Sequence, residues 1–152
     1  MQENMYMECL MRIGKENIKN NIGWRFDNTY SRLPNIMLTR INPVPVKLPN
    51  LVILNDQLSK ELGLNFSNIE NEHLATLFSG NFLPEGSETI AQAYAGHQFG
   101  HFTPQLGDGR AILLGEILDS AGSRVDVQLK GSGITPFSRQ GDGRAALGPV
   151  LR

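Results

Sequence analysis

The chain has 152 residues, of which 40% are hydrophobic and 19% charged, a composition typical of a single globular domain. Fourteen Lys and Arg residues nearly balance fifteen Asp and Glu residues, so no positive excess favours nucleic acid or an anionic membrane as a partner. The lone cysteine, Cys9, excludes an internal disulfide and a multi-thiolate zinc site, and no apolar run reaches the ~20 residues of a membrane span. These features predict a cytoplasmic protein.

Residues 1–23, rich in Met and Asn, are predicted to be a loose lead-in, and residues 24–152 to form one domain. Four prolines between Trp24 and Pro49 disfavour long helices and favour extended segments. The apolar run 51–54 predicts a short buried strand. Asn55 is expected to cap a helix that ends near Gly63.

Two further helices are predicted before the glycine-rich part of the chain. Ser67 and Glu70 have the spacing of a capping box, which predicts a helix with a stripe of apolar residues that ends at Gly80. Ser87 is expected to cap a third, short helix ending before Gly96. Ala145–Leu147 are also compatible with a helix.

The following segment has the pattern of a β-hairpin. Residues 111–117 form an apolar strand, 119–123 a glycine-containing turn, and residues 125–130 alternate apolar and polar side chains. The alternation places Lys130 on the face opposite Val125, Val127 and Leu129. A lysine at the end of a strand, on its polar face, is a candidate ligand contact.

Eleven of the sixteen glycines lie from Gly96 onward, and three groups of them surround this hairpin. Gly107-Asp-Gly-Arg110 precedes it, Lys130-Gly-Ser-Gly133 ends it, and Gly141-Asp-Gly-Arg144 follows. Glycine turns expose backbone N–H groups to an anion, and Arg and Lys supply charge for phosphate oxygens. The order glycine turn, strand, turn, strand, lysine is that of the phosphate-holding half of a kinase-like N-lobe.

A structural interpretation of the same residues stays open. Neither a Walker A pattern nor G-x-G-x-x-G is present, and two Gly-Asp-Gly-Arg runs are also typical of two tight turns in which each Arg pairs with a nearby Asp.

Other polar and aromatic residues are less informative. His97 and His101 are spaced by four, but the glycines beside them disfavour the helix that a zinc site would need, so packing or loop hydrogen bonding is the preferred interpretation and no metal ligand is assigned. Phe99, Phe102 and Phe137 are interpreted as core or loop anchors. Thr135 and Ser138 would need a general base to act as nucleophiles, and none is identified.

The motifs together resemble one known family. The runs Tyr94-Ala-Gly-His-Gln-Phe-Gly100, Gln105-Leu-Gly-Asp-Gly-Arg110, Leu129-Lys-Gly-Ser-Gly133 and Thr135-Pro-Phe-Ser-Arg-Gln-Gly-Asp-Gly-Arg144 are similar to those of the selenoprotein O family, known in bacteria as YdiU. Phe26–Pro34 also resembles the opening of that family.

The resemblance implies a pseudokinase that binds ATP in a flipped orientation and transfers AMP to Ser, Thr or Tyr hydroxyls of proteins. The expected fold is α+β: part of a protein-kinase-like N-lobe, with an antiparallel sheet containing the β-hairpin, short helices, and truncation before the C-lobe. ATP, with Mg or Mn, and protein substrates are the implied partners. The matching motifs imply nucleotide contacts at six positions: Gly107, Gly109, Arg110, Lys130, Asp142 and Gly143.

The resemblance also implies that parts of the site lie beyond Arg152. The glutamate that pairs with Lys130, further arginines, the catalytic aspartate and the metal-binding Asn and Asp all belong to the part of the family sequence that follows. No catalytic residue is therefore assigned in this chain, and the chain alone is expected to be inactive. The alternatives are a catalytically inactive nucleotide-binding or interaction module and a kinase-type phosphotransferase.

Overall fold

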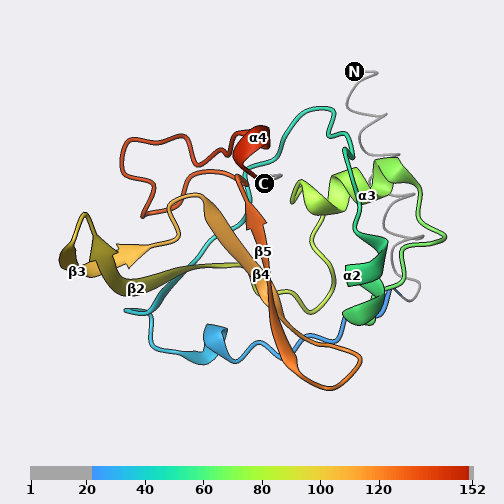
Figure 1. Cartoon of the computed structure of the whole chain (residues 1–152), viewed down its shortest axis with the longest axis horizontal. Coiled ribbons are helices and arrows are strands. Elements are labelled where there is room, and N and C mark those ends of the chain that lie inside the picture. The colour runs from blue at the N-terminus through green and yellow to red at the C-terminus, as the bar shows by residue number, and fades with distance from the viewer. Residues whose placement is uncertain (1–21, 151–152) are drawn as a thin grey trace.

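The computed structural model describes residues 22–150, which form an α+β fold around a five-stranded antiparallel sheet. The sheet order is β1-β2-β4-β5, and β3 pairs with β2 in a hairpin that projects to one side (Figure 1). The strands are β1 (Leu38–Arg40), β2 (Ile90–Gln98), β3 (His101–Gly107), β4 (Ala111–Leu118) and β5 (Arg124–Lys130). The helices are the 3-10 turn η1 (Tyr30–Arg32) and α2 (Asp56–Glu61), α3 (Asn71–Phe78) and α4 (Leu147–Val150).

The predicted β-hairpin is confirmed as β4 and β5. Its turn is closed by Asp119, whose carboxylate accepts hydrogen bonds from the backbone N–H groups of Ala121 and Ser123. Along β5 the apolar residues are more buried than their polar neighbours, and Leu129 is 5% exposed whereas Lys130 is exposed. The period-2 alternation therefore identified the two faces of β5 correctly.

The first predicted helix is confirmed, and the start of the second is corrected. The Asn55 side chain accepts a hydrogen bond from the backbone of Leu58, as expected for an N-cap. α2 ends at Glu61, two residues before Gly63, which has φ +73°. α3 begins at Asn71 rather than at a capping box, because Ser67 bonds back to the side chain of Asn65 in a local turn. Leu74 and Leu77 form the buried side of α3, as predicted.

Two predictions of secondary structure were wrong. The run 51–54 is not a strand: Val52 and Ile53 are 64% and 71% exposed, while its two leucines pack against the core without a partner strand. The helix expected after Ser87 is instead β2, and Ser87 donates to the carbonyl of Pro84 in a turn. β2 forms because strands pair with it along both edges, which outweighs a local helical pattern. The helix-compatible end is confirmed from Leu147 onward as α4.

The sheet has two differently covered faces. One face packs against α3 and the segment that precedes it, in a core made of Ile22, Leu64, Phe66, Leu74, Leu77 and Ile117. On the other face a smaller cluster, Leu38, Ile90 and Leu113, packs against Tyr30. Lys130 shares this second face, because its register partner Ala111 and the next residue of β4 on that side, Leu113, point there.

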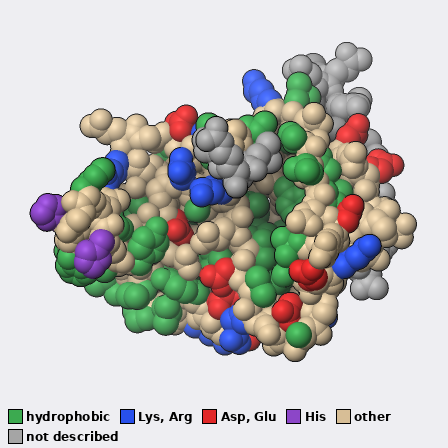
Figure 2. All heavy atoms as spheres, in the orientation of Figure 1, with side chains coloured by type: hydrophobic (Ala, Val, Ile, Leu, Met, Phe, Trp, Pro, Cys, Tyr) green, Lys and Arg blue, Asp and Glu red, His purple; other side chains and the backbone are tan. Residues whose placement is uncertain are grey.

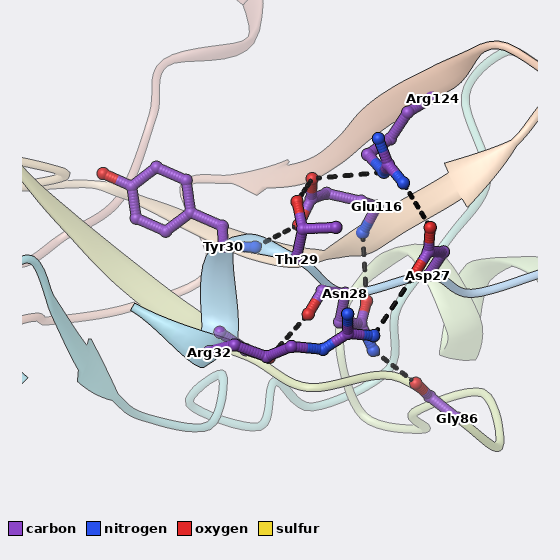
Figure 3. Close-up of polar contacts among 9 residues, drawn as sticks. Asp27, Asn28, Thr29, Tyr30, Arg32, Gly86, Glu116 and Arg124 are labelled. Carbon is purple, nitrogen blue, oxygen red and sulfur yellow. Dashed lines mark hydrogen bonds and ion pairs between the residues drawn. The ribbon is translucent and has the colours of Figure 1, made fainter. Parts of the chain in front are cut away.

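A buried carboxylate fastens the segment before η1 to β4. Glu116 is 5% exposed, and its carboxylate accepts a hydrogen bond from the Thr29 hydroxyl at 2.6 Å and another from the backbone N–H of Tyr30 (Figure 3). Arg124 lies 3.8 Å from the same carboxylate and also pairs with Asp27. The pairing with Arg124 lowers the pKa of Asp27 below its ordinary value. The network places Tyr30 over the second face of the sheet.

The approach of this segment also depends on a glycine in β4. A Cβ at Gly115 would lie 2.6 Å from the side-chain oxygen of Asn28 and 2.6 Å from the ring of Phe26. Asn28 uses that oxygen to accept a hydrogen bond from the backbone of Glu116 at 3.1 Å and donates to the carbonyl of Gly86 at 2.8 Å. Only glycine leaves room for these contacts.

Residues 1–21 of the predicted lead-in, including Cys9, lie outside the described residues. Within residues 22–150, no helix has the length and apolar character needed to cross a membrane.

We predict that Glu116→Leu lowers the free energy of unfolding by about 3 kcal/mol, because it leaves the half-buried donors of Thr29 and Tyr30 without their acceptor and removes one of the two carboxylates beside Arg124. Urea denaturation followed by circular dichroism measures the change. Glu85→Leu, at an exposed position, is the matched control, and equal stability of the two variants would contradict the role given to Glu116.

Candidate functional site

The residues predicted to bind phosphate meet at one end of the sheet. Gly107 ends β3, Gly109 and Arg110 form the turn into β4, and Lys130 ends β5. Lys130 is the register partner of Ala111, and the N–H of Gly131 donates to the carbonyl of Arg110 at 2.6 Å. The strand pairing therefore places the turn 107–110 beside Lys130, two segments that are twenty residues apart in sequence.

The second Gly-Asp-Gly-Arg run packs against the residues that follow Lys130. The N–H of Gly133 donates to the carbonyl of Gly143 at 3.3 Å, and the Arg144 guanidinium donates to the carbonyl of Gly131 at 3.2 Å. Asp142 is exposed, and its carboxylate accepts a hydrogen bond from the backbone N–H of Arg144 at 2.9 Å. The middle segment, 130–133, thus contacts both the turn 107–110 and the run 141–144 through backbone hydrogen bonds.

Close packing accounts for the glycines in this region without a ligand. A Cβ at Gly107 would lie 2.3 Å from the ring of Phe137, and one at Gly109 would lie 2.7 Å from the Phe137 carbonyl oxygen. Gly143 has φ +69°, and a Cβ there would lie 1.9 Å from the carbonyl oxygen of Gly133. These distances are far below van der Waals contact, so each position admits only glycine. Close packing therefore explains why glycine occupies these three positions.

The pairing of each Arg with a nearby Asp, expected for tight turns, is wrong for Arg144, whose guanidinium donates to the backbone carbonyls of Gly131 and Val44 and not to an aspartate. Arg110 is exposed and forms no ion pair with the other described residues. Thr135 and Ser138, considered as nucleophiles, use their hydroxyls to donate to the carbonyls of Asp108 and Gly109, both at 2.6 Å. Both hydroxyls serve to hold the turn 107–110.

Asp108 is a buried carboxylate inside this turn. It is 7% exposed, and its side chain accepts a hydrogen bond from the backbone N–H of Gln92 at 3.0 Å. Burial raises the pKa of Asp108 above its ordinary value, while hydrogen bonds from Gln92 and the Tyr94 side chain oppose the shift. Burial, together with the charge of Asp108, also raises the pKa of Tyr94. Asp108 therefore has a structural role, with its carboxylate directed at β2 rather than at solvent.

A hollow of about 660 Å³ lies beside the glycine turn, between β1, the β2–β3 hairpin and the segment 136–139. Of the six predicted site residues, only Gly107 lines it, whereas Lys130 and Asp142 do not. Its other lining residues include Ile36, Tyr94, Gln105, Phe137 and Arg139. The volume lies in the range of small-molecule sites.

The β2–β3 hairpin ends in exposed aromatic residues. Two histidines lie at its outer end beside hydrophobic surface (Figure 2), and His97 contacts the ring of Phe102 edge to face. Phe99 is 98% exposed and Phe102 is 62% exposed, so neither is the core or loop anchor that was expected. Phe137 packs on Gly107 as an anchor of its loop. The part of the chain that is described brings no three His, Cys, Asp or Glu side chains together to hold a metal ion.

Comparisons with known proteins agree on one family. The model of the family described as protein adenylyltransferase SelO matches residues 21–152. The chain belongs to this family. It is 64% identical over 132 residues to the protein nucleotidyltransferase YdiU of Nitrosococcus oceani, 63% identical over 131 residues to that of Pelagibacter ubique, and 62% identical over 132 residues to that of Anoxybacillus flavithermus.

These matches cover 86–87% of this chain but only 27% of each relative, so the chain spans about a quarter of the length of the family members it matches. The resemblance inferred from the glycine-rich motifs is confirmed. The relatives are named as nucleotidyltransferases, a class of transferase, and the glycine turns described above lie within the matched segment.

We predict that Gly109→Ala lowers the free energy of unfolding by about 1–3 kcal/mol, because the added methyl group would overlap the Phe137 carbonyl and displace the neighbouring turn. Gly148→Ala, where a Cβ meets nothing within 4 Å, should change it by less than about 0.5 kcal/mol. Thermal or urea unfolding measures both, and a Gly109→Ala variant as stable as the unsubstituted chain would contradict this packing.

Proposed function

We propose that residues 24–152 are the ATP-binding portion of a protein nucleotidyltransferase that transfers AMP from ATP to Ser, Thr or Tyr hydroxyls of proteins. The observation that supports this most directly is the convergence of the turn 107–110, Lys130 and the run 141–144 at one end of the sheet. A triphosphate needs cations within its own length, and this end of the sheet supplies the exposed Arg110 and Lys130.

Each predicted residue has a specific role in this proposal. Gly107 and Gly109, packed on Phe137, would contact the phosphates through the backbone of the turn. The exposed Arg110 offers its planar guanidinium to the phosphate oxygens. Lys130 supplies a point charge from the polar face of β5. Asp142 and Gly143 would contact the nucleotide from the second glycine-rich run, which packs against the residues that follow Lys130.

The proposed fold is part of a kinase-like N-lobe. Such a lobe holds nucleotide phosphates between a glycine-rich turn and a lysine on a following strand. Here the glycine turn leads into β4, and β4 pairs with β5, which ends at Lys130. The order and pairing of these elements support the proposal.

The chemistry is an in-line displacement at the α-phosphorus. The substrate hydroxyl oxygen forms a bond to that phosphorus while the bond to the bridging oxygen of the β-phosphate breaks, so pyrophosphate leaves and the hydroxyl proton passes to a base. Charge grows on the phosphate oxygens in the transition state, where Arg110 and Lys130 would stabilise it. We assign the base to no residue of this chain.

The family implies Mg or Mn as a companion of ATP. Among residues 22–150, the carboxylates near the phosphate-binding segments do not form a metal site: Asp108 is buried and bonded to β2, and Asp142 bonds to the backbone of Arg144. These residues do not fit a resident metal ion, and no step is assigned to one.

We predict that Lys130→Ala weakens ATP binding by about tenfold or more, the usual effect of losing a charge-assisted contact to phosphate. Isothermal titration calorimetry with Mg-ATP measures the change, and Lys60→Ala, on the exposed side of α2, is the matched control. Equal affinity of the Lys130→Ala variant and the control would contradict the proposed site.

The mass added to a protein substrate by the family enzyme distinguishes AMP transfer from kinase-type phosphate transfer.

A further inference from the structure

Two glutamine amides form a hydrogen bond on the face of the sheet that carries Lys130. Gln128 precedes Lys130 by two residues, so both side chains leave β5 on the same side. The Gln128 side-chain amide donates to the side-chain carbonyl of Gln92 at 3.0 Å. Gln92 lies on β2, and β4 runs between β2 and β5, so this hydrogen bond spans a whole strand.

Gln92 is at the same time fixed to the glycine turn. Its backbone N–H donates to the Asp108 carboxylate at 3.0 Å, and its backbone carbonyl accepts from the N–H of Asp108 at 3.0 Å. Asp108 stands between Gly107 and Gly109, and its own carbonyl accepts the hydroxyl of Thr135. A continuous path of hydrogen bonds therefore runs from Thr135 through the turn and Gln92 to Gln128.

We propose that Gln92 and Gln128 are positioning residues that hold the glycine turn 107–110 and Lys130 at the separation that a triphosphate requires. The inference rests on the proposed function and adds two residues to it. Backbone pairing joins the turn to β5 only at its edge, through Ala111 and the bond from Gly131 to Arg110, whereas the amide pair joins them across the open face. Both amides are neutral, so they join β2 to β5 without adding a charge that would compete with the cations for phosphate.

A structural and a positioning role predict different measurements. Gln128 is exposed, and a hydrogen bond between exposed side chains contributes little to stability because water replaces it. A merely structural pair would affect ATP binding equally whether or not Lys130 is present. A pair that acts by positioning Lys130 affects binding only while the lysine is there, which a double-mutant cycle detects.

The experiment is calorimetric titration of the 152-residue chain with Mg-ATP for Gln128→Leu, Lys130→Ala and the double variant. We expect Gln128→Leu to weaken binding about fivefold, with no further weakening when it is added to Lys130→Ala. Gln92→Leu should weaken binding by the same factor, and the Gln92→Leu/Gln128→Leu double variant no more than either single one. Gln57→Leu, which removes an exposed amide bonded to Glu61 on α2, is the matched control and should bind like the unsubstituted chain.

The outcomes separate this inference from the proposal on which it rests. Binding that depends on Lys130 but not on Gln128 would overturn the inference and leave the proposed function intact. Equal weakening by Gln128→Leu in both lysine backgrounds would also overturn it. Failure of the folded, unsubstituted chain to bind ATP would overturn both.

Discussion

Gly109 lies so close to the carbonyl oxygen of Phe137 that any larger residue would overlap it, and the arrangement of the candidate site depends on this contact. The hydroxyls of Thr135 and Ser138 hold the turn from one side, while the backbone of Gln92 holds its buried Asp108 from the other. The turn is therefore fixed in place before any ligand binds. A turn that is already held rigidly loses little conformational entropy when a ligand binds beside it.

The two faces of the sheet explain where such an anion would bind. The face toward α3 is filled by apolar side chains, and the other face carries Lys130 and the glutamine amides. Glu116 contributes to this division, because its buried carboxylate draws Thr29 and Tyr30 over the middle of the second face and leaves the end with Lys130 open. In the described part of the chain, one face of the sheet is covered by the apolar core, and the other face carries Lys130 and the glutamine amides at one end.

Short-range patterns predicted part of this architecture. The alternation in residues 125–130 located the β4–β5 hairpin and the exposed Lys130, and Asn55 located the start of α2, since both signals depend on neighbouring residues alone. β2 was mistaken for a helix because its partners lie far away in sequence, in β1, β3 and β4. The error at Ser67 has a different origin: Ser67 bonds to Asn65, only two residues away, and this local turn competes with the capping box.

The candidate site shows the same limit. Motifs identified the three glycine-rich segments and their order, but they did not show that Gly107 and Gly109 are required by Phe137, or that Arg144 bonds to backbone carbonyls. Gln92 had no signal of its own, because it lay in a segment assigned to a helix. For Gln128 the alternation along β5 predicted a position beside Lys130 on the same face. The structure adds its hydrogen bond to Gln92, on which the positioning role rests.

The central claim is that the three glycine-rich segments of this chain together bind ATP. The most direct test follows the backbone amide resonances of the chain during titration with Mg-ATP by nuclear magnetic resonance. The account predicts that the largest shifts gather in residues 107–110, 130–133 and 141–144, with little change in α2 and α3. Shifts confined to other elements, or no shifts in a folded chain, would contradict it.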